Sequence, residues 1–152
     1  MNSDFRPRLK GNKKIAYDYI NKQERRILVI GDIHAPFTLC GYLEFCKETY
    51  AKYNCNQVIF IGDIIDNHYA SFHTSDPDGF GGGDELDIAV EVVKQWANAF
   101  PVADVTIGNH DRIIMRKAFD SQIPSRWTKS FNEVLGVDWT WAVGIVYDGV
   151  TL

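Results

Sequence analysis

Three short apolar runs, each closed by a glycine, constrain this chain more than any other feature. They are RILVIG at 26–31, QVIFIG at 57–62 and VADVTIG at 102–108. The first two do not alternate apolar with polar residues, which predicts strands buried on both faces. Between the runs, apolar residues recur every three or four positions over 38–53 and 84–100, the spacing of a helix face. This order predicts parallel βαβ units and an α/β fold.

The pattern continues after the third run. We expect helices at 111–119 and 125–135, a strand at 139–147 and the beginning of another at 150–152. Asp84 suits the N-cap of the helix over 84–100. In parallel sheets, ligands collect at the carboxyl ends of the strands, so these ends are the place to look for a functional site.

Length and composition favour one globular domain without a targeting segment. The chain has 152 residues, which suits a single domain. No apolar run approaches the roughly 20 residues that span a bilayer, and the first residues lack the apolar stretch of a signal peptide. Three cysteines without a C-x-x-C pair give no disulfide framework. A cytoplasmic protein without membrane contact is the expectation.

Charge is distributed unevenly along the chain. The net charge is −4, but residues 1–26 carry +5 and the remainder −9. We therefore expect a basic N-terminal arm over 1–25 ahead of a domain over 26–152. Such an arm can attract nucleic acid, although it is also typical of a solvated terminus.

Polar residues follow each predicted strand at once. The segments are GDIH at 31–34, GDIIDNH at 62–68 and GNHD at 108–111. Alone, an Asp or Asn after a strand is usually a turn or cap residue. Three neighbouring strand ends that deliver carboxylate, imidazole and amide oxygen together favour a divalent metal such as Mn, Fe or Zn. Several carboxylates crowded there would repel one another without a cation.

These three segments resemble the first three motifs of the calcineurin-like metallophosphoesterases. The resemblance covers about residues 26–152. It implies a sandwich of β-sheets flanked by helices, and a hydrolase that cleaves phosphomonoesters or phosphodiesters at a centre of two divalent metal ions. A nucleotide or nucleic-acid phosphodiester is slightly favoured by the basic arm.

The resemblance also implies roles for single residues. Asp32 and His34 would hold the first metal, Asp63 would bridge both metals and Asn109 would hold the second. His110 would stabilise or protonate the leaving oxygen. Asp66 and Asp111 would fix their neighbours without touching metal.

Two further residues have open assignments. His68 lies in the loop after the second motif and either contacts substrate or belongs to a polar surface loop. Arg112, with Arg116 four residues later, either meets substrate phosphates or balances a solvated helix face.

The chain departs from the family pattern after the third motif. The family supplies further histidine ligands downstream, yet none of the four histidines here follows His110. We therefore expect a domain cut before its second sheet is complete. The alternative to an active phosphoesterase is a catalytically weak or inactive domain that binds metal or a partner chain. The natural substrate, the metal and the oligomeric state are left open.

Overall fold

The structure is a computed structural model that describes residues 25–72, 76, 78–147 and 149–152. Apart from Arg25, the predicted basic arm at 1–25 lies outside these residues. Within the described ranges, no helix combines the length and apolar character that crossing a bilayer requires.

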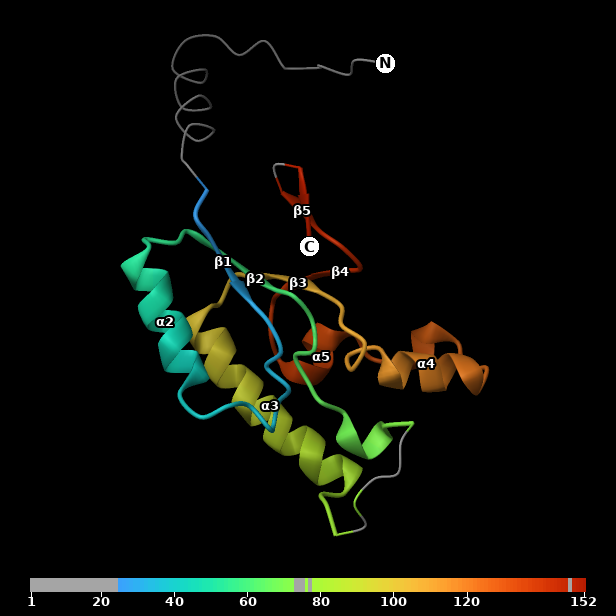
Figure 1. The fold of residues 1–152 in the computed structure, drawn as a ribbon. Helices are drawn as coiled ribbons and strands as arrows, with labels where there is room; N and C mark the ends of the chain where they lie inside the picture. The colour runs from blue at the N-terminus through green and yellow to red at the C-terminus, as the bar shows by residue number, and fades with distance from the viewer. Residues whose placement is uncertain (1–24, 73–75, 77, 148) are drawn as a thin grey trace, which may run out of the picture.

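A parallel sheet of four strands forms the centre of the fold (Figure 1). The strands lie in the order β1-β2-β3-β4, and every neighbouring pair is parallel. Their bounds are β1 Ile27–Ile30, β2 Gln57–Phe60, β3 Asp104–Thr106 and β4 Thr140–Ala142. The predicted α/β class and parallel order are confirmed. All four carboxyl ends therefore meet at one edge, where the polar segments lie.

Helices connect the strands and pack mainly on one face of the sheet (Figure 1). They are α2 Tyr42–Lys52, η1 His68–Ala70, α3 Gly82–Ala99, α4 Ile113–Asp120, η2 Ser125–Trp127 and α5 Phe131–Leu135. The core lies between this face and α2, α3 and α5. Trp96 of α3 is at its centre, with its ring centroid 5.3 Å from Tyr42 and 6.1 Å from Phe60. Because both sides of the contact are large and apolar, burial fixes the helices on the sheet.

On the opposite face, polar contacts join β2 and β3 to a short hairpin. This hairpin, β5 Val146–Tyr147 and β6 Val150–Thr151, forms a separate antiparallel pair. The Tyr147 hydroxyl bonds to a carboxylate oxygen of Asp104 and accepts a hydrogen bond from Gln57 at 2.6 Å. The prediction that the first strand is buried on both faces is wrong at Val29, which is 45% exposed. β1 is the edge strand, and these hairpin contacts are made with β2 and β3 instead.

Three element boundaries also differ from the prediction. The strand expected over 139–147 is two strands, since the chain turns at 143–145 and β5 joins the hairpin. The helix expected over 125–135 divides because Ser130 begins α5 with a capping box to Glu133. Asp84 lies inside the first turn of α3, whose N-cap is Gly81.

Candidate metal centre

The loops after β1 and β2 are joined by backbone hydrogen bonds beyond the strand ends. The amide of His34 donates to the carbonyl of Asp63, and that of Ala35 to Ile64, both at 2.9 Å. The amide of Asp66 returns a 2.9 Å bond to Ala35. This extra pairing places His34 beside Asp63, although the two residues are far apart in the chain.

Two glycines let the second and third loops touch. Gly62 has a φ of +88°, and a Cβ on it would lie 2.6 Å from the Cα of Gly108. A Cβ on Gly108 would lie 2.2 Å from Oδ1 of Asp63. No side chain fits in either gap, so the glycines that close the apolar runs are needed for backbone approach as well as for the turn.

The same edge holds several non-glycine residues in the left-handed region. Asp32, His34, Asp63 and Asn67 have φ values of 48°, 47°, 51° and 52°. Such backbone costs on the order of 1–3 kcal/mol per residue and persists where surrounding contacts enforce it. Its concentration in the loops after β1 and β2 directs us to this edge as a functional site.

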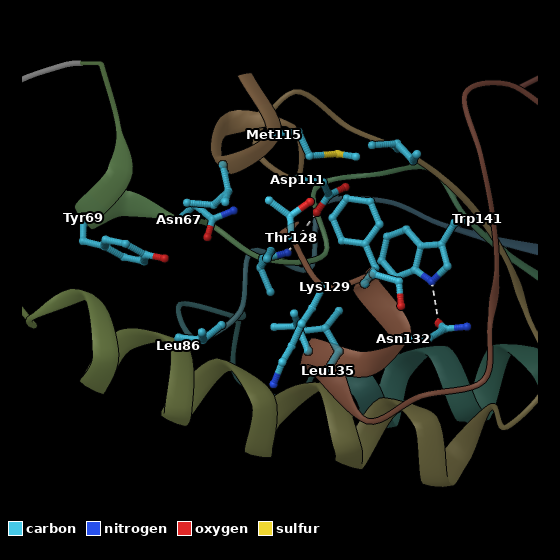
Figure 2. Close-up of a pocket in the computed structure, with 16 residues that line it drawn as sticks. Asn67, Tyr69, Leu86, Asp111, Met115, Thr128, Lys129, Asn132, Leu135 and Trp141 are labelled. Atoms are coloured by element: carbon cyan, nitrogen blue, oxygen red, sulfur yellow. Dashed lines mark hydrogen bonds between the residues drawn. The ribbon is translucent and has the colours of Figure 1, made fainter. Parts of the chain in front are cut away.

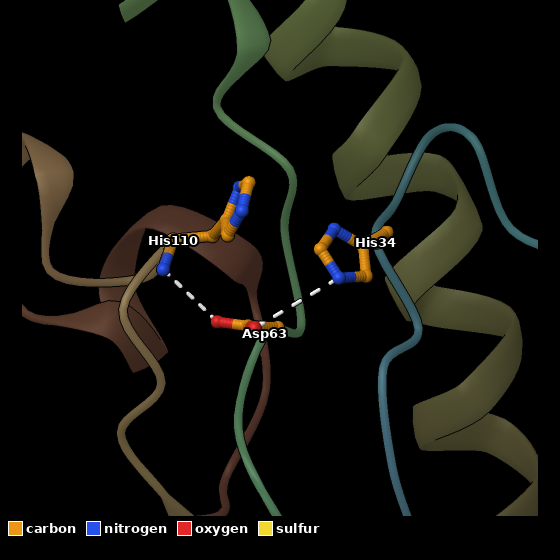
Figure 3. A group of neighbouring side chains, drawn as sticks. All are labelled: His34, Asp63 and His110. Carbon is orange, nitrogen blue, oxygen red and sulfur yellow. Dashed lines mark hydrogen bonds and ion pairs between the residues drawn. The ribbon is translucent and has the colours of Figure 1, made fainter. Parts of the chain in front are cut away.

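Three side chains converge there into a group with metal-ligating atoms. One such atom each from His34, Asp63 and His110 lies within 4.8 Å of the other two (Figure 3). Nε2 of His34 is 3.8 Å from Oδ2 of Asp63 and 3.8 Å from Oδ1 of Asp32. All three members of the group are partly buried, which keeps them accessible to an ion while holding them in place.

Asp66 orients both histidines. One carboxylate oxygen lies 2.7 Å from Nδ1 of His34, and its carbonyl oxygen lies 2.6 Å from Nδ1 of His110. Because a carboxylate and a carbonyl only accept, they favour a proton on each Nδ1 and leave the lone pair on Nε2. An acceptor behind a ligating imidazole raises its basicity and fixes its ring.

Asp111 connects the loops after β2 and β3 through hydrogen bonds to their backbone. Its side chain is only 1% exposed, and it accepts hydrogen bonds from four backbone amides, those of Asp63, Ile64, Ile65 and Gly108. Burial raises the pKa of Asp111, and amides of the same loops offset part of that rise. The second and third motifs therefore share one buried anchor.

Sequence reasoning missed a second buried carboxylate, Glu85. It is 2% exposed and accepts from the amides of His68 at 2.7 Å and Tyr69 at 3.1 Å. Its position carries a detectable signal, because it lies four residues before Ala89 and eight before Val93 on the buried stripe of α3. A carboxylate on an apolar helix stripe needs a partner, here the loop after the second motif.

The other predicted site residues differ in how they relate to this group. Asp32 has a side chain 76% exposed, and Asn109 is exposed between Gly108 and His110. Nδ1 of His68 is 4.0 Å from Oδ2 of Asp66. Arg112 immediately precedes α4. The structure thus brings Asp32, Asp66 and His68 to the three-residue group.

The donor set fits a divalent first-row metal. Carboxylate oxygens of Asp32, Asp63 and Asp66 all lie within 4 Å of the His34 ring nitrogens. Three carboxylates around one imidazole concentrate negative charge that a cation would neutralise. Mixed nitrogen and oxygen donors suit Mn, Fe or Zn.

A cavity of about 380 Å³ lies next to this site but is separate from it (Figure 2). Asp111 and Asn67 form part of its wall, and most of the remaining lining is apolar. Phe131 and Trp141 stack on one side with ring centroids 4.3 Å apart. None of His34, Asp63 and His110 lines it, so the metal chemistry belongs to the open edge of the sheet.

The comparisons with known proteins agree with this geometry. The model of the calcineurin-like phosphoesterase family matches residues 25–149, and the chain belongs to that family. The family and the group of His34, Asp63 and His110 together support a metal-dependent phosphoesterase in general. Neither the search of curated proteins nor that of solved structures gave a match.

Proposed function

We propose that this protein hydrolyses phosphodiesters of nucleotides or nucleic acid at a centre of two divalent metal ions, with manganese as a suitable ion. Asp32, His34, Asp63 and Asn109 would hold the metals. The observation that carries this proposal is the convergence of His34, Asp63 and His110 at the carboxyl edge of the sheet. The bound metals would activate water and neutralise the phosphoryl oxygens.

The contacts of Asp63 support its proposed role as a shared ligand. Its Oδ1 accepts the amide of His110 at 2.9 Å, while Oδ2 faces Nε2 of His34. The carboxylate therefore lies between the first and third loops. We propose that it bridges the two metals.

His110 is proposed to deliver a proton to the leaving oxygen. Its Nδ1 is engaged by the Asp66 carbonyl, which leaves Nε2 as the atom that gains and loses the mobile proton. Imidazole titrates near neutral pH and is suited to this step. His68 and Arg112 are proposed to contact the substrate.

The decisive test is hydrolysis of bis(p-nitrophenyl) phosphate with added Mn²⁺. We expect turnover that disappears with a chelator and in Asp63→Ala. Asp138→Ala is a matched control, because Asp138 is exposed and precedes β4 at the opposite end of the parallel strands. Turnover that survives in Asp63→Ala would contradict the proposal.

A non-catalytic metal-binding domain is the second candidate. It is favoured by the metal-ligating group found in the described residues, which consists of His34, Asp63 and His110 and offers enough donors for one ion. Mn²⁺ binding by calorimetry without any turnover would select this candidate.

The preference for nucleic acid depends on the basic residues of 1–26. Neutralised phosphates release counterions, so affinity should fall on a log–log plot with a slope of about −0.9 per contact. A titration of short DNA at two salt concentrations, with and without residues 1–24, measures this. If the deletion changes neither the affinity nor the slope, the basic residues do not support a preference for nucleic acid.

A further inference from the structure

An exposed group of three rings borders the metal centre. The side chains of Phe37 and His68 are 52% and 48% exposed, and Phe80 is 53% exposed. Phe37 lies at the middle, with ring centroids 6.3 Å from His68 and 6.4 Å from Phe80. We call these three rings the aromatic rim. Many apolar side chains of this protein are exposed singly, but rings that gather beside a ligand-binding edge indicate a contact surface.

Short connections join the aromatic rim to the metal centre. The amide of Phe37 donates to the carbonyl of His34 at 2.7 Å. This turn connects the residue that carries the Phe37 ring to a member of the metal-ligating group. At the other side, His68 approaches Asp66, whose carboxylate bonds to His34. A molecule with its phosphate at the metal centre therefore has the aromatic rim within reach of the rest of its structure.

The segments that carry the aromatic rim are held together before any ligand arrives. Glu85 accepts the amides of His68 and Tyr69, which fixes η1 to α3. Gly82 approaches Tyr69 so closely that a Cβ on it would lie 2.6 Å from the ring. Phe80 stands two residues before this contact. Preorganised rings lose little entropy on binding, and Glu85 acts here as a positioning residue.

We propose that the aromatic rim stacks the base of a nucleotide whose phosphate lies at the metal centre. This rests on the proposed phosphoesterase function and names its substrate class. Ring-on-base stacking strengthens binding by roughly 5- to 150-fold per base and tolerates any base. The rim residues lie beside the group of His34, Asp63 and His110 and outside it, so a ligand whose ring is joined to its phosphate through a spacer suits both surfaces. A ribose supplies that spacer, whereas an aryl phosphate does not.

Binding of two ligands that differ only in the base tests the proposal. Adenosine 5′-monophosphate and ribose 5-phosphate are titrated by calorimetry into the full chain with Mn²⁺. We expect the nucleotide to bind roughly thirtyfold more tightly, the middle of the range that stacking allows. Phe37→Leu and Phe80→Leu should reduce nucleotide affinity about fivefold and leave ribose 5-phosphate unchanged, since leucine keeps an apolar side chain but has no aromatic face.

Two further variants complete the design. Phe119→Leu is the matched control, because Phe119 is 81% exposed in the last turn of α4 and should change neither affinity. Glu85→Gln should weaken nucleotide binding while ribose 5-phosphate and Mn²⁺ binding are retained, which a merely destabilised protein would not show. Far-ultraviolet circular dichroism verifies that each variant is folded.

The outcomes separate this proposal from the proposed function. Equal affinity for the two ligands, or an unchanged nucleotide preference in both phenylalanine variants, would overturn the aromatic rim whether or not the protein has turnover. Tighter, rim-dependent binding of phosphotyrosine than of nucleotide would overturn it in favour of aryl phosphates. A rim-dependent nucleotide preference without hydrolysis of bis(p-nitrophenyl) phosphate would support the aromatic rim and reject the hydrolytic function.

Discussion

Asp111 and Asp63 lie in neighbouring loops of one sheet edge, yet their carboxylates are in opposite environments. Asp111 is buried and accepts four backbone amides. Asp63 has a side chain 15% exposed and faces the ring of His34. Both follow a glycine within three residues in similar motifs. The difference teaches that amide donors and burial, rather than residue type and spacing, separate a structural carboxylate from one available to a ligand.

The electrostatics of the two carboxylates follow from this contrast. The negative charge of Asp111 is matched by N–H dipoles that the fold supplies, so it needs no ion. Among the residues that the structure describes, one amide, that of His110, donates to the Asp63 side chain, and two more carboxylates lie near the same His34 ring. The open side of the edge therefore suits a cation, whereas the buried side is satisfied by backbone amides.

The largest effect is expected from Asp111→Ala. Removing the carboxylate leaves several buried backbone amides without an acceptor. Each unsatisfied amide costs about 1–3 kcal/mol where water cannot replace the partner. We expect the free energy of unfolding in chelator to fall by roughly 3–5 kcal/mol, measured by urea denaturation. Asp111→Asn keeps one acceptor oxygen and should lose less. A loss below about 0.5 kcal/mol in the alanine variant would place the anchor elsewhere.

Asp63→Ala should show the reverse pattern. We expect Mn²⁺ binding to disappear in calorimetry, because this carboxylate is proposed to be shared by both metals. The free energy of unfolding without metal should change by only about 1 kcal/mol, since one hydrogen bond from a backbone amide is lost and like-charge repulsion is relieved. An unchanged metal stoichiometry would refute the bridging role.

Asp66→Asn probes the contact behind the histidines. An amide at this position holds His34 less firmly, because it replaces the carboxylate that lies 2.7 Å from Nδ1, so Mn²⁺ affinity should fall about 10–100-fold. Calorimetry at constant pH measures the loss, and the Asp138→Ala variant gives the baseline. Retained affinity would mean that the 2.7 Å contact has no influence on the metal.

The smallest effect is expected from Asp32→Ala. Its side chain is largely exposed, so unfolding should be unaffected within about 0.5 kcal/mol. Mn²⁺ affinity should fall by about tenfold or less, because an exposed side chain gives up rotamer freedom on binding and so contributes less than one already held in place. A loss as complete as that of Asp63→Ala would show that the two carboxylates contribute equally to Mn²⁺ binding.

Comparison of the prediction with the structure separates local from distant effects. The apolar runs, their glycines and the helix stripes between them predicted the parallel sheet, and the motifs predicted the family. The strand over 139–147 was predicted wrongly, because apolar residues continue through a turn that only the pairing of β5 with β6 reveals. All the site assignments stay predictions, namely those of Asp32, His34, Asp63, Asp66, His68, Asn109, His110, Asp111 and Arg112.

The sequence alone determined the order of the elements and which polar residues stand at the strand ends, because periodicity and glycine position act over a few residues. Only the tertiary structure decided which carboxylates became anchors. The amides that Asp111 binds in the second loop lie 46 to 48 residues away, and those of Glu85 lie 16 and 17 residues away. Such partners are chosen when the chain packs, since a buried carboxylate must find donors wherever the fold brings them.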